Sequence, residues 1–495
     1  MTEQQHSSAL AGRERIRPDR PEWAAGDIPP HRRPLPLITR DALTVPTARP
    51  THDRLAALNE RRRVGSWPPE VAELRERGAA IRRETLPDLE KYLQQLTGNV
   101  ERNGGVVHRA ATPADARAVI EQIARENGVR LVVKSKSMAT EEIHLNSHLT
   151  AQGIEVVETD LGEYIVQLAD ERPSHIVGPA LHKSRQDVAD LFGQLAGDVV
   201  SGDPDDLAAF ARTRLRADFK AAGMGISGVN FAAADTGTLA IVTNEGNADM
   251  VTSQPRVHVA VMTVEKVIPR FADLGVLIPL LCDAATKQRV SVYQTLVNGP
   301  RREGESDGPE QLHLVILDNG RTKALGTPQE EVLACIRCGN CQIACPVYRT
   351  VGGGHPYSAV YGGPIGAVLS PLIGAPGTDS DLPFLSSLCG ACYDACPVKI
   401  PIPDLLVNLR AEHERERGSS AARAGWRAWS LAWRTETGYR ATLAAARLMG
   451  RLLPDRLLAR LPGPGRGWAG GRALPPLREA GAFRRWFHGR DRRQR

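Results

Sequence analysis

Seven of the eight cysteines in this 495-residue chain lie in two short runs between Cys335 and Cys396. The first run has the spacing C-x2-C-x2-C-x3-C-P, and the second has the spacing C-x2-C-x3-C-P. Two-cluster ferredoxins use the first spacing to supply three thiolates to one iron–sulfur cluster and a fourth to its neighbour. The cysteines therefore predict two [4Fe-4S] clusters and an electron-transfer role.

The two runs are expected to exchange ligands, because the last cysteine of the first run points away from the loop formed by the other three. Each predicted cluster then takes thiolates from both runs. The first cluster is held by Cys335, Cys338, Cys341 and Cys396, and the second by Cys345, Cys389 and Cys392.

The second cluster lacks one thiolate. The position in register with the first run is Ser386, and the sequence leaves open whether the fourth iron binds Ser386, water, a partner group or nothing. The eighth cysteine, Cys282, could complete the site, but a lone cysteine in an apolar stretch is more often a small buried hydrophobic residue. Structural zinc is the alternative use of clustered cysteines, but seven thiolates with two C-x3-C-P endings fit poorly to its usual two separated pairs.

A longer segment that precedes the cysteines alternates short apolar runs with helical patterns. The apolar runs that predict strands are LVVK at 131, IEVVET at 154, HIVG at 175, TLAIVT at 238, VHVAVMT at 257 and LHLVILD at 312. Continuous apolar runs are typical of buried, largely parallel strands. Helices are predicted at 71–96, at TPADARAVIEQIARENG with its Thr cap and Pro, at SRQDVADLFGQLAG and at VEKVIPRFADLG. This alternation indicates an α/β domain.

Polar residues follow several of these predicted strands. Residues 235–238 (DTGT) and 244–247 (NEGN) flank one strand and could share a sheet edge, where α/β domains bind ligands. Four charged residues after an earlier strand could belong to the same site: Lys134, Lys136, Glu141 and Glu142. The alternative is ordinary turns and a solvated face, since no G-x-G-x-x-G or Walker pattern is present. Four histidines show no metal-ligand spacing: His144, His175, His182 and His258.

The chain divides into four predicted regions. Residues 1–70 are rich in Arg and Pro without a sustained period and predict a flexible arm. Residues 71–322 form the α/β domain, and residues 323–417 form a helical domain around the clusters. Residues 418–495 are basic and contain several Trp residues. From Glu412 onwards there are 19 Arg against 7 Asp and Glu, although the formal net charge of the whole chain is only +6.

The basic region also predicts a docking helix over about 440–460. Arg440, Arg447 and Arg451 recur on one side, opposite an apolar stripe that includes Leu448 and Met449. A partner or an anionic membrane surface is expected to bind it rather than nucleic acid, because no helix-turn-helix or zinc-finger signature is present. The alternative is an ordinary packing helix. No signal-peptide pattern and no bilayer-spanning apolar window appears, so the expected location is cytoplasmic, with peripheral contact at the inner membrane face as an option.

Several of these motifs together resemble the lactate utilisation protein B family. The resemblance rests on KSKSM, EEI and LN at 134–146, on GISGVNFAAADTGTLAIVTNEGN, on both cysteine runs, on the YGGPIGAVLSPLI spacer and on the Trp-bearing carboxyl region. It implies a lactate-utilisation domain similar in fold to the sugar-phosphate isomerase and CoA transferase group, followed by an all-α two-cluster ferredoxin-like domain. It also implies the same seven ligands, with a three-cysteine second run as a family feature.

The resemblance implies an iron–sulfur electron-transfer subunit of a multi-protein system that oxidises L-lactate to pyruvate. No flavin or nicotinamide fingerprint appears, so the chemistry at carbon is expected on other subunits of that system. No catalytic residue, electron acceptor or stoichiometry is predicted, and whether this chain binds lactate stays open. Two alternatives are an iron–sulfur redox sensor and an α/β-domain enzyme whose clusters are structural.

Overall fold

A computed structural model describes residues 35–357, 360–373, 379–452 and 479–493. The described residues up to Ala411 form one compact unit, and those from Glu412 form a second. The α/β part and the cysteine runs both belong to the first unit.

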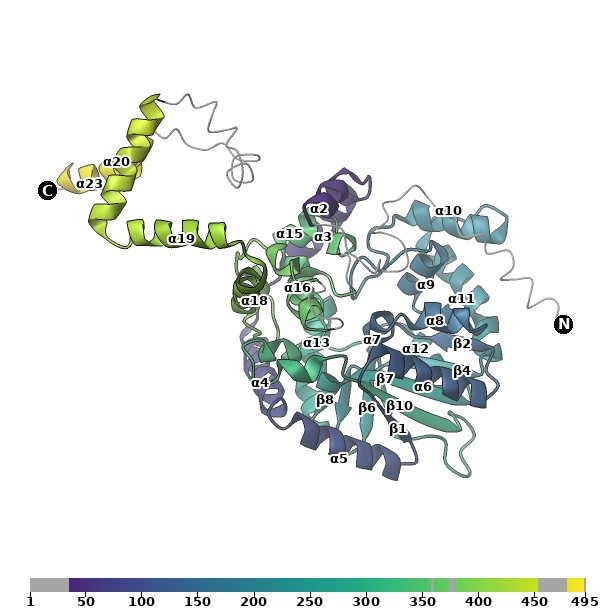
Figure 1. The fold of residues 1–495 in the computed structure, drawn as a ribbon. Coiled ribbons are helices and arrows are strands. Elements are labelled where there is room, and N and C mark those ends of the chain that lie inside the picture. The colour runs from purple at the N-terminus through teal and green to yellow at the C-terminus, as the bar shows by residue number, and fades with distance from the viewer. Residues whose placement is uncertain (1–34, 358–359, 374–378, 453–478, 494–495) are drawn as a thin grey trace. The chain divides into compact units, whose positions relative to one another are not determined.

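A six-stranded parallel sheet lies at the centre of the α/β part (Figure 1). Its strands, in spatial order, are β1 (Val106–Ala110), β10 (Gln311–Leu317), β7 (Val257–Thr263), β4 (Met224–Gly228), β2 (Leu131–Lys134) and β3 (Glu155–Glu158). Every neighbouring pair is parallel, and Val257 pairs with Gln311 on one side and Met224 on the other. All seven residues of β7 are buried, which confirms the prediction of buried parallel strands.

Helices cover both faces of this sheet. Val259 and Val261 of β7 pack with α6 (Pro113–Glu126) and α8 (Leu145–Ala151), whereas Ala260 and Met262 pack on the opposite face with α5 (Leu89–Arg102). Alternate side chains of a strand point to opposite faces, which explains this division. Beside β2 and β3 lie α9 (Leu161–Leu168), α10 (Arg185–Ala196), α11 (Pro204–Ala221) and α12 (Asn247–Ser253).

The predicted start of α6 is confirmed by a reciprocal cap. Thr112 Oγ1 accepts a hydrogen bond from the Asp115 amide (3.2 Å), and Asp115 Oδ2 accepts one from the Thr112 amide (2.9 Å). Pro113 occupies the first helical position, where its missing N–H costs nothing.

A second, four-stranded sheet has the order β8 (Val267–Ile268), β5 (Phe231–Ala233), β6 (Thr238–Thr243) and β9 (Tyr293–Val297). The TLAIVT run is therefore a strand, β6, but it is antiparallel to both β5 and β9. The predicted helix at VEKVIPRFADLG is wrong. That segment forms two 3-10 turns, η2 (Val264–Lys266) and η3 (Phe271–Asp273), on either side of β8, because Pro269 disfavours helix at the preceding residue.

The predicted strand at HIVG is also wrong, because its amides bond to a side chain instead of a neighbouring strand. His175 Nδ1 accepts hydrogen bonds from the amides of Val177 (3.1 Å) and Gly178 (3.2 Å). Burial, followed by the charges of Arg62 and Lys136, lowers the pKa of His175 to about 3, so the ring is neutral and can accept.

Residues 35–70 are not an arm, which corrects the prediction for that part of 1–70; residues 1–34 lie outside the described residues. Residues 35–70 contain α2 (Leu35–Thr44) and α3 (Ala48–Arg62), and they lead into α4 (Pro69–Thr85). Ile38 and Leu55 are buried in the core that contains the cysteines. Arg54 Nη1 donates to the carbonyl oxygens of Leu181 (2.9 Å) and Lys183 (3.0 Å). These long-range contacts have no periodic signature in the sequence.

The described residues around the cysteines form helices and no strands. The elements are η4 (Arg321–Ala324), η5 (Glu330–Ala334), α14 (Asn340–Ala344), α15 (Pro346–Thr350), η6 (His355–Tyr357), α16 (Gly363–Leu369), η7 (Ser370–Leu372), η8 (Leu382–Phe384), α17 (Ala391–Asp394) and α18 (Ile402–Arg417). Helix α13 (Leu274–Thr286) of the α/β part packs against α4.

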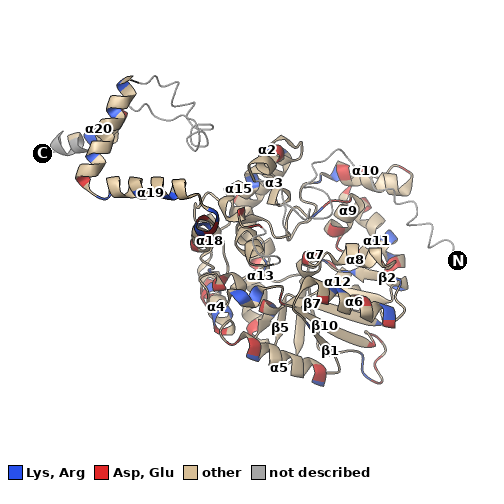
Figure 2. Ribbon diagram, in the orientation of Figure 1, with Lys and Arg blue, Asp and Glu red and all other residues tan. Residues whose placement is uncertain are grey.

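The second unit contains the end of α18, then α19 (Ser420–Trp433), α20 (Glu436–Leu452) and α23 (Ala482–Arg493). Figure 2 shows basic residues recurring along α20. Leu448 and Met449 are exposed, so these residues of the predicted apolar stripe face solvent in the described second unit. The rest of the predicted helix, 453–460, lies outside the described residues. Within the described part, no helix is both long and apolar enough to cross a bilayer.

Candidate functional site

The seven cysteines of the two runs come together as two adjoining groups. Burial raises the pKa of Cys341, and the nearby charges of Cys338, Cys335, Cys392 and Cys396 raise it further. The pKa of Cys396 is raised to about 11 by burial and by Cys335. Cys396 therefore lies with the first run although it belongs to the second.

The remaining cysteines form the other group. Burial raises the pKa of Cys392 to about 12, with further contributions from Cys345 and Cys389. The charge of Cys392 also raises the pKa of Cys341, which belongs to the first group. The two groups therefore adjoin. The division into four and three matches the predicted ligand exchange, which stays a prediction that this grouping supports.

Backbone amides point at several of these sulfur atoms. The amide of Arg337 lies 3.4 Å from Cys335 Sγ, that of Tyr348 lies 3.5 Å from Cys345 Sγ, and that of Ile400 lies 3.3 Å from Cys396 Sγ. Left-handed residues allow the tight loops: Arg337 (φ 61°), Gly339 (φ 73°), Leu388 (φ 54°), Gly390 (φ 85°) and Lys399 (φ 56°). Amide donors of this kind stabilise thiolate ligands and tune cluster potentials.

The donor set fits iron–sulfur clusters. Several buried thiolates repel one another and lose hydration, so they need cationic partners to ionise together. No group of three His, Cys, Asp or Glu side chains in the described residues is arranged around a single ion. A cluster needs a wider arrangement, because its ligands lie at the corners of a cube.

Among the possible fourth ligands of the second cluster, Ser386 and Cys282 are the two side chains of this chain that the sequence offers. Ser386 Oγ accepts a hydrogen bond from the amide of Leu388 (3.2 Å). Cys282 is buried in α13, where burial raises its pKa and Ser291 is its hydrogen-bond partner. Both side chains have other partners, and the identity of the fourth ligand stays open.

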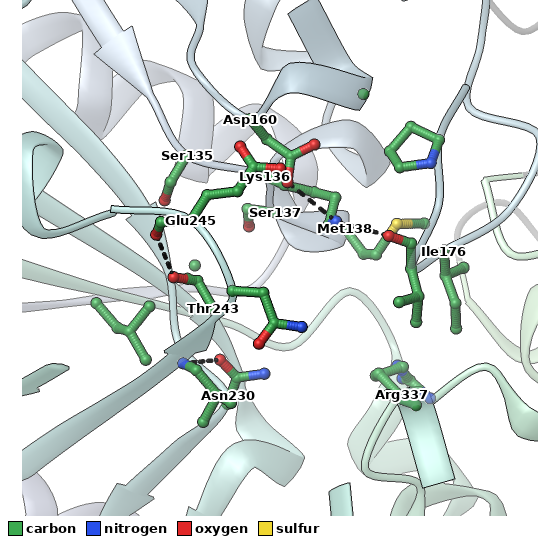
Figure 3. Close-up of a pocket in the computed structure, with 18 of the residues that line it drawn as sticks. Ser135, Lys136, Ser137, Met138, Asp160, Ile176, Asn230, Thr243, Glu245 and Arg337 are labelled. Carbon is green, nitrogen blue, oxygen red and sulfur yellow. Dashed lines mark hydrogen bonds and ion pairs between the residues drawn. The ribbon is translucent and has the colours of Figure 1, made fainter. Parts of the chain in front are cut away.

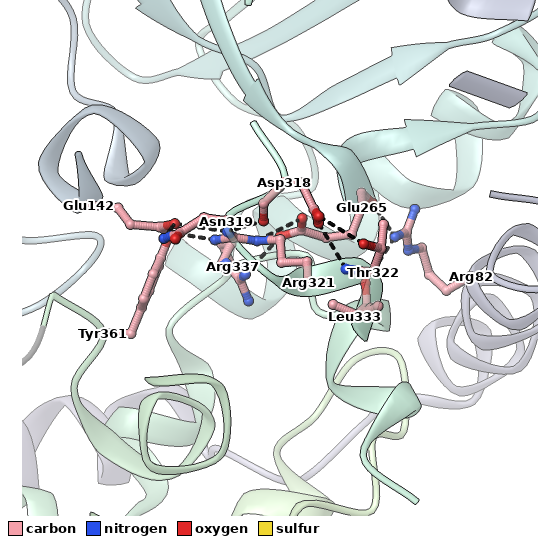
Figure 4. Close-up of polar contacts among 10 residues, drawn as sticks. All are labelled: Arg82, Glu142, Glu265, Asp318, Asn319, Arg321, Thr322, Leu333, Arg337 and Tyr361. Carbon is pink, nitrogen blue, oxygen red and sulfur yellow. Dashed lines mark hydrogen bonds and ion pairs between the residues drawn. The ribbon is translucent and has the colours of Figure 1, made fainter. Parts of the chain in front are cut away.

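A buried ionic network joins the cysteine region to the α/β part (Figure 4). Arg321 forms a two-point pair with Glu142 (2.8 and 2.5 Å) and an ion pair with Glu265 (3.1 Å). Arg337, which lies between Cys335 and Cys338, pairs with Glu265 at 2.8 Å. Tyr361 donates to Glu142 at 2.8 Å. Of the polar residues predicted near a site, Glu142 thus belongs to this network.

A cavity of ≈560 Å³ lies at the carboxyl ends of the parallel strands (Figure 3). Its walls come from the segments that follow β2, β3, β4 and β7, from α13, and from the cysteine region through Arg337 and Tyr361. This is the position at which α/β sheets generally bind ligands. Arg337 thus reaches a cavity built mostly by the α/β part.

The cavity contains only some of the predicted polar residues. Lys136 lines it and pairs with Asp160 at 3.2 Å, and the turn at 244–247 contributes Glu245 and Asn247. The turn at 235–238 does not line it. That turn lies at the other end of β6, where Asn103 Nδ2 donates to the carbonyl oxygen of Thr236 (3.0 Å). The expectation that both turns share one edge is therefore wrong, because they lie at opposite ends of the six-residue strand β6.

Lys134 and Glu141 belong to a separate buried cluster. Lys134 Nζ contacts Glu158 at 2.6 Å and Glu141 at 3.2 Å. Burial raises the pKa of Glu158 to about 7. The charge of Lys134 lowers this pKa but only partly offsets the effect of burial, and the charge of Glu141 raises it further. Burial also raises the pKa of Glu163, with Glu141 and Glu158 adding to the effect.

Sequence reasoning did not identify Glu265, Arg321 and Arg337 as members of the buried network, and it did not identify Lys266, which lines the cavity. Lys266 and Glu265 lie in the segment whose pattern predicts a helix, and Arg321 follows the last strand of the sheet without a motif. The position of Arg337 between two cysteines was the one available signal.

Comparison with known proteins agrees with this organisation. Residues 93–317 match the LUD domain family, and residues 331–400 match the 4Fe-4S dicluster domain family. A lactate utilization protein B from Geobacillus kaustophilus is 45% identical over 88% of this chain and 91% of its own length. The chain belongs to the lactate utilization protein B family.

Other members show similar coverage. The protein of that name from Bacillus pumilus is 44% identical over 92% of this chain and 95% of its own length. The protein of that name from Bacillus cytotoxicus is 50% identical over 75% of this chain and 76% of its own length. A solved structure of a DUF162 family protein from Deinococcus radiodurans is 12% identical with a TM-score of 0.27, covering 46% of this chain and 98% of that one. The two family matches show that this chain combines a LUD domain with a 4Fe-4S dicluster domain.

Proposed function

We propose that this protein is an iron–sulfur electron-transfer subunit that supports the oxidation of L-lactate to pyruvate. The observation that carries the proposal is the assembly of seven cysteines as adjoining groups of four and three, within a chain of the lactate utilization protein B family. In this proposal Cys335, Cys338, Cys341 and Cys396 hold one [4Fe-4S] cluster, and Cys345, Cys389 and Cys392 hold the other. Such clusters, when bound, carry single electrons.

The chain's own residues support this role, because they hold the two proposed cluster sites close together and largely buried from solvent. Six of the seven cysteines are buried, and Cys389 is exposed. An exposed ligand places one edge of the second site near solvent, where an electron-transfer partner can approach. We therefore assign the exchange with a partner to the side of Cys389.

The proposal also covers the organisation of the chain. It comprises the LUD-type α/β domain, with a fold similar to the sugar-phosphate isomerase and CoA transferase group, and an all-α ferredoxin-like domain around the clusters. The segment from α2 to α4 packs against the ferredoxin-like domain. Trp67 Nε1, between α3 and α4, donates to the carbonyl oxygen of Asp394 (2.8 Å), and Arg75 of α4 donates to that of Cys396 (2.8 Å). The other subunits of a lactate oxidation system are the proposed partners.

The second unit supplies a docking surface in this proposal. Trp426, Trp429 and Leu431 of α19 are exposed, as are Leu448 and Leu452 of α20. Exposed aromatic and aliphatic residues beside arginines suit a partner subunit or the anionic inner face of a membrane.

The functional test is anaerobic co-purification with co-expressed neighbouring subunits, followed by addition of L-lactate. Bleaching of the cluster absorption on addition of L-lactate, but not of buffer, is expected. A complex that oxidises lactate while the absorption of this subunit never changes would contradict the proposal. Lactate oxidation that persists after cluster loss would instead favour structural clusters.

A further inference from the structure

Arg82 of α4 is a fully buried arginine, and no carboxylate among the described residues forms an ion pair with it. Its guanidinium donates instead to backbone carbonyl oxygens (Figure 4): Nη1 to Val267 (3.0 Å), Nη2 to Glu265 and to Leu333 (3.1 Å), and Nε to Ala334 (3.3 Å). Carbonyl oxygens satisfy the N–H groups but carry no formal charge. A charge that is buried this deeply needs an anionic group nearby.

The carbonyl contacts place Arg82 beside the first cysteine group. Ala334, whose carbonyl oxygen accepts from Nε, immediately precedes Cys335 in the chain. Burial lowers the pKa of Arg82 to about 10, whereas the charges of Glu265 and Cys335 raise it. The guanidinium therefore stays charged at neutral pH, and the Cys335 thiolate is one of the anionic groups that act on it.

Glu265 cannot supply all of the counter-charge for Arg82, because its carboxylate already serves two other arginines. It pairs with Arg321 at 3.1 Å and with Arg337 at 2.8 Å. Glu142 is the second carboxylate that pairs with Arg321. Three arginines thus share two carboxylates in this buried network, and net positive charge remains next to the first cysteine group.

Lys266 adds to this positive charge. It follows Glu265 in η2, and its side chain lines the cavity. Burial lowers the pKa of Lys266 to about 8, and the charge of Arg337 lowers it further. The charges of Glu265 and Cys335 raise it. Lys266 is therefore mostly charged at pH 7, and it acts on the same sulfur atom as Arg82.

We propose that Arg82 and Lys266 raise the reduction potential of the first cluster without being ligands to it. The inference rests on the proposed function, because it requires a cluster at the first cysteine group. One-electron reduction by the lactate-oxidising partner adds one negative charge to the cluster, and no bond forms or breaks. Nearby cations therefore stabilise the reduced form more than the oxidised form. The net negative charge of a cluster with four thiolates also supplies the counter-charge that Arg82 lacks.

The second cysteine group provides an internal control, because a different cation acts on it. Burial raises the pKa of Cys345, and the charge of Arg349 in α15 opposes this effect. The influence of a charge falls with distance. Loss of Arg82 or Lys266 should therefore shift the potential of the first cluster much more than that of the second.

A redox titration of the anaerobically purified full-length chain at pH 7, followed by electron paramagnetic resonance, tests the inference. The first cluster's signal is the one that Cys338→Ser removes. Arg82→Gln deletes the charge but keeps N–H donors. It should lower the ratio of reduced to oxidised first cluster at a fixed potential by about tenfold, the strength of a unit charge ~10 Å away in a protein interior. For a one-electron couple this ratio corresponds to about 59 mV.

Two further variants separate charge from packing. Arg82→Lys keeps the charge and should restore most of the potential. Arg77→Gln removes an exposed arginine from the same helix, α4, and should leave both potentials unchanged.

Three results would overturn the inference: an unchanged first-cluster potential in Arg82→Gln, an equal shift of both clusters, or a shift in Arg82→Lys as large as in Arg82→Gln. If Arg82→Gln fails to retain iron and sulfide, Lys266→Met replaces it, because it leaves the carbonyl bonds of Arg82 in place. It should also lower the first cluster's potential, and no shift would overturn the inference. Unshifted potentials with both clusters present refute this inference alone, whereas a wild-type chain without sulfide refutes the proposed function.

Discussion

Asn340 in the first cysteine run donates a hydrogen bond from Nδ2 to the carbonyl oxygen of Ala395, the neighbour of Cys396 in the second run (2.9 Å). Asn340 is fully buried, so this bond is shielded from water. It joins the start of α14 to the end of the second cysteine loop. The contact holds Cys396 beside the first run, as ligand exchange requires.

Replacement of Cys396 by Ser should therefore damage the first cluster, although the other three proposed ligands lie far upstream. Cys392→Ser is the matched variant and should damage the second cluster instead. Low-temperature electron paramagnetic resonance of the reduced proteins separates the two signals. Loss of only the second cluster's signal in Cys396→Ser would show that the exchange assignment is wrong.

The buried Glu142–Arg321 pair predicts a large stability effect. Glu142→Gln removes one charge of a fully buried network, and leaving Arg321 without that partner should lower the free energy of unfolding by about 3–5 kcal/mol. Glu90→Gln breaks an exposed pair with Arg109 and should cost no more than about 1 kcal/mol. Anaerobic urea unfolding of both variants makes the comparison, and equal losses would contradict the structural role of the network.

The raised pKa of Glu158 predicts a pH dependence of stability. Its pKa is about 7 in the folded chain and 4.5 ordinarily, so the folded state binds the proton more tightly. Stability from this group is therefore full below about pH 4.5 and declines as the pH rises towards 7. Relative to Glu158→Gln, the wild type should lose about 2–3 kcal/mol between pH 5 and pH 8. Thermal melts at both values check this, and a constant difference would contradict it.

The basic second unit predicts a separable docking role. A chain that ends at Gly418 should keep its iron and sulfide, because the cysteines and their contacts lie in the first unit. Its association with partner subunits or with phosphatidylglycerol vesicles should fall strongly, since the exposed Trp residues and the arginines are removed. Co-sedimentation and pull-down measure both. Undiminished association with both partners and vesicles would refute docking by this unit.

Local patterns account for most of what the sequence could predict. The spacing of the cysteines, the Thr112 cap and the continuous apolar strand β7 depend on neighbours in the chain, so they are visible in one sequence. The position of α3 depends instead on Arg54 reaching two carbonyl oxygens more than a hundred residues away. Such contacts leave no periodic pattern.

The residues that line the cavity could also be predicted only in part from the sequence. Lys136 follows a predicted strand and could be named, because strand ends gather at one sheet edge. Lys266 and Arg337 enter from a 3-10 turn and a cysteine loop. The pairing of Glu265 with Arg337 and the bonds from Arg82 to the carbonyl oxygens of Glu265 and Leu333 bring these two segments together. The two turns around β6 could not meet at one edge, because they lie at opposite ends of a six-residue strand.

Quantification of iron, acid-labile sulfide and zinc in the anaerobically purified chain tests the central claim most directly. Two clusters predict about eight iron and about eight sulfide per chain, or about seven iron if the corner without a cysteine ligand is open. Stoichiometric zinc without sulfide would contradict the account, because thiolates arranged for zinc cannot serve as electron carriers.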